Sequence, residues 1–141
     1  MKKIVLIILI NCFLFLFCKG QKVDTMIYIL PEVAPTFKYD TCTNLVSSVK
    51  EYFMDNYKMP KILIDNGYAG RVFVEFVIEK DGYLSNVKLC RGIDEALDKT
   101  VIETIKTMPQ WIPGINNEKN VRTKLILPIS IHWLYGRIED E

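Results

Sequence analysis

The sequence is poor in the side chains on which most enzyme sites depend. Of its 141 residues, one is histidine (His132) and four are cysteine, with no CxxC pair or other metal-ligand spacing. The glycines follow neither the Walker nor the dinucleotide-binding spacing, and the acidic residues pair only within short surface runs. Residue alternation puts His132 in mid-strand, on the face opposite the apolar positions. We therefore predict that the chain is not an enzyme and uses no cofactor or metal.

Strong positive charge is also missing. Eighteen lysines and arginines oppose 17 acidic residues, and three of those lysines lie in residues 1–20. Without that segment 15 basic residues remain, which gives a net charge of about −2. Nucleic-acid binding requires a strongly basic surface, so no nucleic-acid partner is predicted. The remaining 121 residues suit one domain and contain no second apolar run that could cross a bilayer.

Residues 1–20 combine two lysines, an apolar run and small residues at its end, which is the pattern of a secretory signal peptide. Cys18 and Gly20 would occupy the small positions, with cleavage before Gln21 and export to the periplasm. One alternative is a retained inner-membrane anchor, although about 15 apolar residues fall short of the roughly 20 that span a bilayer. Another is a lipoprotein modified at Cys18, although Phe17 precedes it where a small residue is usual.

Outside this leader only Cys42 and Cys90 remain. In an exported protein the two thiols could form a disulfide, which would close a loop of roughly 48 residues and add about 4 kcal/mol. The other interpretation is two separate, partly buried thiols, and the spacing does not decide between them.

A helix is predicted over residues 44–57, with Thr43 or Asn44 as its N-cap. Its apolar residues recur at spacings of three and four. They are Leu45, Val49, Tyr52 and Phe53. Pro60 ends the helix, and Gly67 closes a short amphipathic turn that follows.

From residue 71 the apolar period changes to two, which predicts a hairpin over residues 71–90 with Asp81-Gly82 as its turn. Asp94 is then expected to cap a helix over residues 95–108. The core stripe of this second helix repeats at helical spacing. It consists of Leu97, Val101, Ile105 and Met108.

The stretch MPQWIPG follows the second helix. Pro109 stops that helix, and Trp111 is expected to cover the junction between helix and sheet. Pro113-Gly114 suits the centre of a type II turn, in which glycine accepts a positive φ. This turn would direct the chain toward the last strand.

The last predicted strand, residues 121–133, alternates apolar and polar positions but contains Pro128. Proline is confined to edges and bulges, so we expect a sheet edge around Pro128. An exposed edge is a template for strand addition by a partner. Arg122, Lys124 and Pro128 also discourage self-association, so a docking edge and a merely protected edge both remain open.

Together these elements predict an α+β fold. Its core is a small antiparallel three-stranded sheet in β-β-α-β order, with helices on one face and an additional N-terminal helix. The chain divides into a signal peptide (1–20), an extended arm (21–42), a domain (43–135) and a charged tail (136–141). Within the arm, residues 25–30 are β-prone and predict a short strand or extended segment.

Several motifs, in order, resemble the signature of the TonB C-terminal domain family. They are Tyr57, Pro60, Gly67, Gly70 and Asp81-Gly82; Arg91-Gly92, Asp94 and Leu97; Met108 to Gly114, with Pro109, Trp111 and Pro113; and Leu127-Pro128-Ile129. The resemblance extends over roughly residues 27–133. It implies a periplasmic, non-catalytic domain that binds the TonB box of outer-membrane receptors as an added strand and transmits energy for transport.

Carried over by position, the docking strand is Val121–Ile131, flanked by Tyr57 and Pro60. Its members are Val121, Arg122, Thr123, Lys124, Leu125, Ile126, Leu127, Pro128, Ile129, Ser130 and Ile131. The implied partners are TonB-dependent receptors of the outer membrane or other envelope proteins. A homodimer through an exposed hairpin is a further possibility.

Three features depart from the family pattern. The family's Tyr-Pro pair is split here into Tyr57 and Pro60, and Leu63 stands where a small residue is usual. A full energy transducer also has an uncleaved inner-membrane helix and a long proline-rich linker. Here we expect neither, because the domain begins shortly after a leader that is expected to be cleaved. We therefore favour a periplasmic protein-binding module. The alternatives are a short anchored TonB, which would engage inner-membrane motor proteins through a retained leader, and a structural envelope protein.

Cleavage of the leader predicts a mature N-terminus at Gln21. Intact-mass measurement of the protein recovered from the cell envelope should give the mass of residues 21–141. Recovery of the chain with residues 1–20 attached would favour the anchored alternative.

Overall fold

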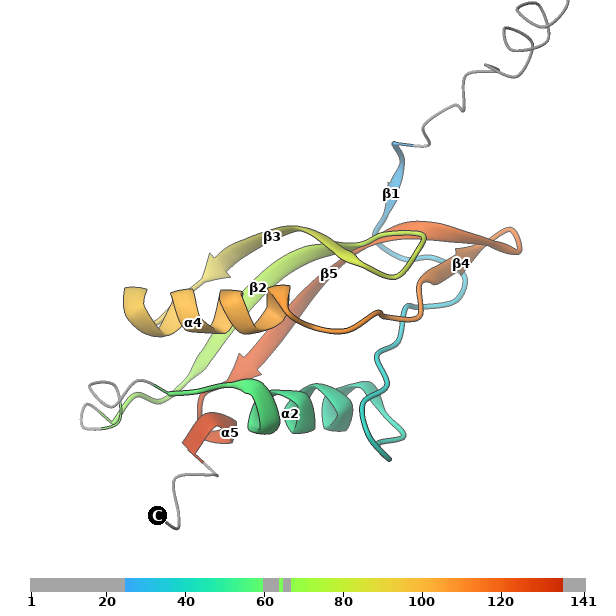
Figure 1. Cartoon of the computed structure of the whole chain (residues 1–141). Coiled ribbons are helices and arrows are strands. Elements are labelled where there is room, and N and C mark those ends of the chain that lie inside the picture. The colour runs from blue at the N-terminus through green and yellow to red at the C-terminus, as the bar shows by residue number, and fades with distance from the viewer. Residues whose placement is uncertain (1–24, 60–63, 65–66, 136–141) are drawn as a thin grey trace, which may run out of the picture.

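The computed structural model describes residues 25–59, 64 and 67–135, which form one twisted sheet with helices on a single face (Figure 1). The elements are β1 (Ile27–Tyr28), α2 (Leu45–Asn56), β2 (Arg71–Ile78), β3 (Leu84–Arg91), α4 (Glu95–Lys106), β4 (Gly114–Asn116), β5 (Lys119–Ser130) and α5 (His132–Tyr135). The strand order is β1-β5-β2-β3, and β4 pairs with β5. The α+β prediction is confirmed, but the sheet has five strands rather than three.

The two additional strands are short. β1 contributes two residues parallel to β5, within the segment for which a strand or extended arm was predicted. β4 forms a tight hairpin with β5 through Asn117 and Glu118, both at positive φ. Two consecutive residues at positive φ make a type I′ turn, which suits the twist of paired strands. No strand was predicted here, because three strand residues are too few to show a period.

Both helices begin where a side chain caps them. The Asn44 side chain accepts a hydrogen bond from the Ser47 N–H at 2.8 Å, and Asp94 accepts from Ala96 and Leu97. Each cap satisfies N–H groups that have no partner within the helix. Both caps were predicted. α4 ends earlier than predicted, at Lys106, yet Met108 is still buried beyond its end.

The core lies between the sheet and the two helices. β2 contributes Val72, Val74, Phe76 and Ile78; α4 contributes Leu97, Val101 and Ile105; and α2 contributes Val49, Tyr52 and Phe53. All are buried, as the predicted stripes require. Pro60 and most of the turn predicted after it lie outside the described residues, but Gly67, at φ +60, has the predicted left-handed conformation.

The end of β5 differs from the prediction. The strand stops at Ser130, so His132 is not in mid-strand but begins the short helix α5. The Ile131 N–H donates to the carbonyl oxygen of Gly70 at 3.0 Å, which holds the chain as it leaves the sheet. Leu134 is buried. Burial of Leu134 in α5 thus outweighs the alternating pattern that predicted a strand up to residue 133.

Trp111 joins the hairpin to the arm. Its backbone N–H donates to the carbonyl oxygen of Gly82 at 2.9 Å, and its ring stacks on Phe37 at 4.9 Å and meets Phe76 edge-on at 5.5 Å. Gly82 has φ +85, and a Cβ there would lie 2.1 Å from the Trp111 carbonyl oxygen. Glycine is therefore required at position 82 for two reasons: other residues rarely adopt this φ, and a side chain would clash with the Trp111 carbonyl group.

Gly114 has a different role from the one predicted. It is the first residue of β4 and lacks the positive φ of a type II turn. A Cβ at Gly114 would lie 2.5 Å from Thr123 Oγ1 and 3.0 Å from the Pro31 ring. The glycine therefore allows the N-terminal arm to cross close to β5.

Replacing Trp111 by alanine is expected to lower the free energy of unfolding by about 3–5 kcal/mol, because its 2% exposed ring fills the contact between arm and hairpin. Urea unfolding measures this change. Trp111→Phe should cost less, since a ring remains to stack on Phe37. The neighbouring Ile112→Ala serves as an exposed control, and an equal loss in both alanine variants would contradict the assignment.

Candidate functional site

Within the part of the chain that the structure describes, one edge of the sheet has no strand partner over seven residues. β2 pairs with β5 without interruption from Arg71↔Ser130 to Ile78↔Thr123. On the side away from β2, β1 pairs only at Arg122 and Thr123. From Lys124 to Ser130 no described strand lies on that side. We refer to residues 124–130 as the open edge.

The edge expected around Pro128 is therefore present. Proline has no N–H to donate, and the β2 register runs through Pro128 unbroken. We infer that the Pro128 nitrogen faces away from β2, as does the backbone of residues two and four positions earlier. The N–H and C=O groups of Lys124 and Ile126 then point outward, available to an added strand.

The predicted docking residues do not all share this environment. Val121 pairs with Gly114 of β4, Arg122 and Thr123 pair with β1, and Ile131 lies beyond the end of β5. The other seven form the open edge.

Of the two predicted flanking residues, Tyr57 and Pro60, the structure describes only Tyr57. The Tyr57 side chain is 9% exposed, and its hydroxyl lies 3.0 Å from Thr100 Oγ1, so it ties the end of α2 to α4. Pro60 lies outside the described residues.

An apolar groove of about 420 Å³ runs beside the open edge. It is lined by Leu45, Val46 and Val49 of α2, Leu125, Ile126, Leu127, Pro128 and Ser130 of β5, and Arg71 and His132. Val46 and Ile126 are 62% and 50% exposed. Apolar groups exposed together are typical of an interaction surface. The helical wall of the groove was not predicted from the sequence, although Val46, an apolar residue outside the core stripe, was a signal for it.

The polar atoms of the groove gather at the C-terminal end of β5. Arg71 pairs with Ser130 across the ladder, and Ser130 Oγ lies 2.7 Å from His132 Nδ1. None of the groove-lining residues is acidic. The groove therefore combines apolar walls with a cationic end.

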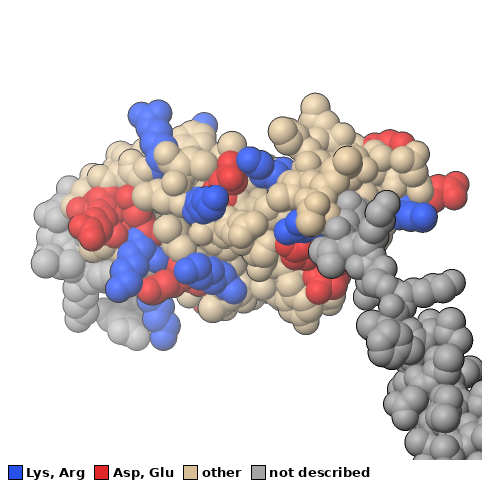
Figure 2. Space-filling view, turned by 90° about the horizontal axis from the view of Figure 1, so that it is seen from above, with Lys and Arg blue, Asp and Glu red and all other residues tan. Residues whose placement is uncertain are grey.

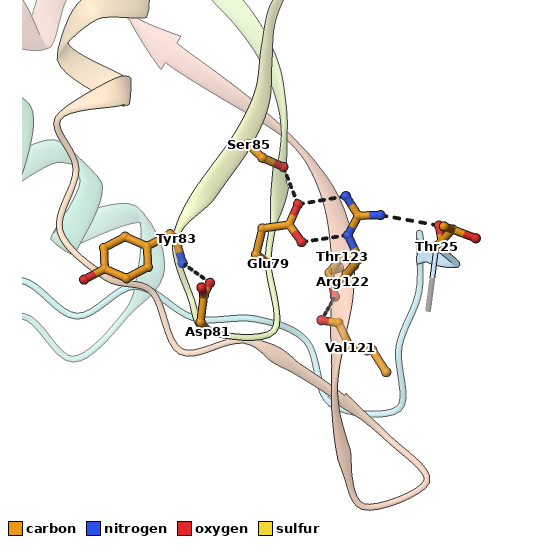
Figure 3. A network of polar contacts seen from close by, with 8 residues as sticks. All are labelled: Thr25, Glu79, Asp81, Tyr83, Ser85, Val121, Arg122 and Thr123. Atoms are coloured by element: carbon orange, nitrogen blue, oxygen red, sulfur yellow. Dashed lines mark hydrogen bonds and ion pairs between the residues drawn. The ribbon is translucent and has the colours of Figure 1, made fainter. Parts of the chain in front are cut away.

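The other end of the open edge is closed by an ion pair (Figure 3). Arg122 donates to both Glu79 carboxylate oxygens at 2.7 and 2.8 Å and to the Thr25 carbonyl oxygen at 3.4 Å. Ser85 Oγ also donates to Glu79. Arg122 first, and Ser85 in addition, hold the pKa of Glu79 below its ordinary value. These contacts tie β2, β3, β5 and the segment before β1 together.

The face seen from above carries charges of both signs next to one another (Figure 2). Lys124 Nζ lies 3.4 Å from a Glu75 carboxylate oxygen, so this cation is also paired within the molecule. Cys42 and Cys90 are both free thiols, so the disulfide left open by the sequence is absent. No helix among the described residues has the length and apolar character needed to cross a membrane, and the predicted leader lies outside them.

Fold and site together define a small α+β module whose most distinctive surface is an open strand edge beside an apolar groove. Residues 56–131 match the family described as Gram-negative bacterial TonB protein C-terminal, and the chain belongs to that family. The resemblance predicted from the motifs is thus confirmed. TonB C-terminal domains are interaction modules rather than enzymes.

The solved structures that are similar to this chain include two NMR solution structures of the Helicobacter pylori TonB C-terminal domain. The shorter form is 22% identical with a TM-score of 0.47, over 63% of this chain and 94% of that one. The longer is 21% identical with a TM-score of 0.45, over 60% of this chain and 77% of that one. No curated protein matches the chain.

The lowered pKa of Glu79 predicts a pH-dependent contribution to stability. The native state binds the proton less tightly than the unfolded state, so the stabilisation is present above the ordinary pKa of 4.5 and is lost as the pH falls through the lowered value. Glu79→Gln should therefore reduce the free energy of unfolding near neutral pH. The difference from wild type should shrink in acid.

Unfolding measured in urea across this pH range checks the prediction. Glu103→Gln, at an exposed position on α4, is the matched control. A pH dependence that is the same in both variants would contradict a role for the Glu79–Arg122 pair.

Proposed function

We propose that this chain is a periplasmic TonB-like binding module that docks extended, TonB-box-like segments of outer-membrane transporters. The docked segment adds as a strand to residues 124–130, and the complex takes part in energy-dependent transport across the outer membrane. The observation that carries the proposal is the open edge of β5 beside the α2 groove.

Strand addition divides recognition between backbone and side chains. The outward N–H and C=O groups of β5 would bind the guest backbone, and alternate guest side chains would enter the groove. Each hydrogen bond contributes a net 0.5–1.5 kcal/mol or so, whereas association costs roughly 4 kcal/mol or more. A seven-residue ladder alone is therefore a weak binder, and the apolar groove must supply the rest.

The second sheet edge is a poorer docking site. The pairing of β2 with β3 is irregular twice, and Asn86 of β3 has φ 51. A bulge re-aims the backbone groups that a guest strand would use. β3 also carries the exposed residues Lys88 and Arg91, and charge along an edge discourages pairing.

The place of this module in the envelope depends on the leader. Cleavage at Gln21 favours the soluble periplasmic form, whereas a retained leader favours an anchored transducer that engages inner-membrane motor proteins. A structural envelope protein would use the same edge for another partner. Co-purification with the motor proteins would distinguish the anchored transducer from the soluble module and from the structural envelope protein.

Docking by strand addition predicts that Ile126→Pro abolishes partner binding while the domain stays folded. This change removes an outward N–H that β2 does not use. Ile126→Thr keeps that N–H and a β-branched side chain, so it should bind nearly as well as wild type. Circular dichroism and urea unfolding report whether each variant is folded.

Photo-crosslinking in cells measures the docking. A photoreactive residue at Val46, in the groove wall, should give an adduct with a TonB-dependent receptor, identified by mass spectrometry. Ile126→Pro should remove that adduct, and a probe at Lys88 on β3 should not give it. A receptor adduct that survives Ile126→Pro, or the same adduct from both probe positions, would contradict strand addition at the open edge.

A further inference from the structure

The cationic end of the groove offers a contact to a side chain of the guest, in addition to the contacts that β5 offers to its backbone. We infer that Arg71 makes the open edge selective for an extended segment that carries a carboxylate where it passes the end of β5. This inference rests on the proposed function, because it concerns the same groove.

Arg71 is placed at the junction of groove and sheet. It is the first residue of β2, pairs with Ser130 at the last position of β5, and is exposed. Arg71 is among the residues that line the groove, together with Ser130 and His132. A guest strand lying along residues 124–130 would therefore pass the guanidinium at one of its two ends.

The charges nearby distinguish Arg71 from Arg122 and Lys124 of β5. Arg122 is held by Glu79, and Lys124 by Glu75. Arg71 has no ion pair among the described residues, and the groove contains no carboxylate of its own. An arginine at an apolar groove without an acidic neighbour is complementary to an anion brought by the partner. The planar guanidinium can bind both oxygens of a carboxylate at once.

Neighbouring groups favour the same ligand. The Ser130 Oγ and His132 Nδ1 atoms lie 2.7 Å apart at this end and share one hydrogen bond. When Nδ1–H is the donor in that bond, the Ser130 hydroxyl hydrogen is left to donate to an anion. The rest of the lining, from Leu45 to Pro128, is apolar apart from backbone. The preferred guest is thus an alternating apolar strand with an acidic residue, or a free C-terminus, at its Arg71 end.

Three synthetic heptapeptides test the inference on the folded mature chain. The first alternates threonine and valine, is acetylated and amidated, and has glutamate at its last position. The second replaces glutamate by glutamine. The third is the glutamine peptide with a free C-terminus. Because an isolated peptide can pair in either direction, its acidic end can reach Arg71. Amide shifts of residues 124–130 in an NMR titration report both the site and the dissociation constant.

The glutamate peptide should bind about two- to fivefold more tightly than the amidated glutamine peptide, as expected for an exposed charge pair. Arg71→Gln should remove this difference without weakening the glutamine peptide, and Arg71→Lys should keep part of it. Arg91→Gln, at an exposed position on β3, is the control and should change nothing. A preference for the third peptide as well would assign a free C-terminal carboxylate as an equivalent ligand.

The outcomes separate this inference from the proposed function. If the glutamate and amidated glutamine peptides shift residues 124–130 with equal affinity, selection by Arg71 is wrong and docking stands. If neither peptide shifts those residues, both proposals fail. A preference that survives Arg71→Gln would place the anion site elsewhere. Self-association of the chain in sedimentation, lost in Arg71→Gln, would assign the groove to a second copy and overturn the inference.

Discussion

Among the described strands, only β2 is hydrogen-bonded to the β5 backbone between Lys124 and Ser130, and the rest of the structure is arranged around this constraint. An unpaired edge is costly when buried and hazardous when exposed, since any extended chain can pair with it. The fold keeps it rigid from the other side. β2 holds it over eight residue pairs, and β2 itself is fixed by core packing against both helices.

Several features limit what can add to this edge. β1 occupies Arg122 and Thr123, so a guest strand on the same side cannot extend past Lys124 without displacing it. Pro128 removes one donor, and the Lys124–Glu75 pair sets charges beside the edge. These are protective devices, but they stop short of covering the strand. An edge that needed only protection would not also have an exposed apolar groove beside it.

Local signals predicted much of the fold. The caps at Asn44 and Asp94, the turn at Gly82 and the edge at Pro128 each follow from the conformation or hydrogen bonding of one residue, which sequence shows directly. The roles of Gly114 and His132 were predicted wrongly, because they depend on the arm crossing β5 and on α5 packing against α2. The groove was missed for the same reason. Its helical wall and Arg71 come together only when α2 docks beside β5, a contact between residues about 80 positions apart.

The two ends of the open edge differ chemically, and this difference gives the site a direction. At the β1 end, the Arg122 guanidinium is hydrogen-bonded to Glu79 and Thr25, so its charge stabilises the fold rather than a guest. At the α5 end, Arg71 has no ion pair with any residue that the structure describes, and it lines the groove. A backbone ladder alone accepts a guest in either direction and in several registers, because every residue offers the same groups. One unsatisfied cation at a single end removes that degeneracy, since only one placement of an acidic guest residue meets it. Arg71 would thus convert a sheet edge that accepts many strands into one that favours a particular alignment.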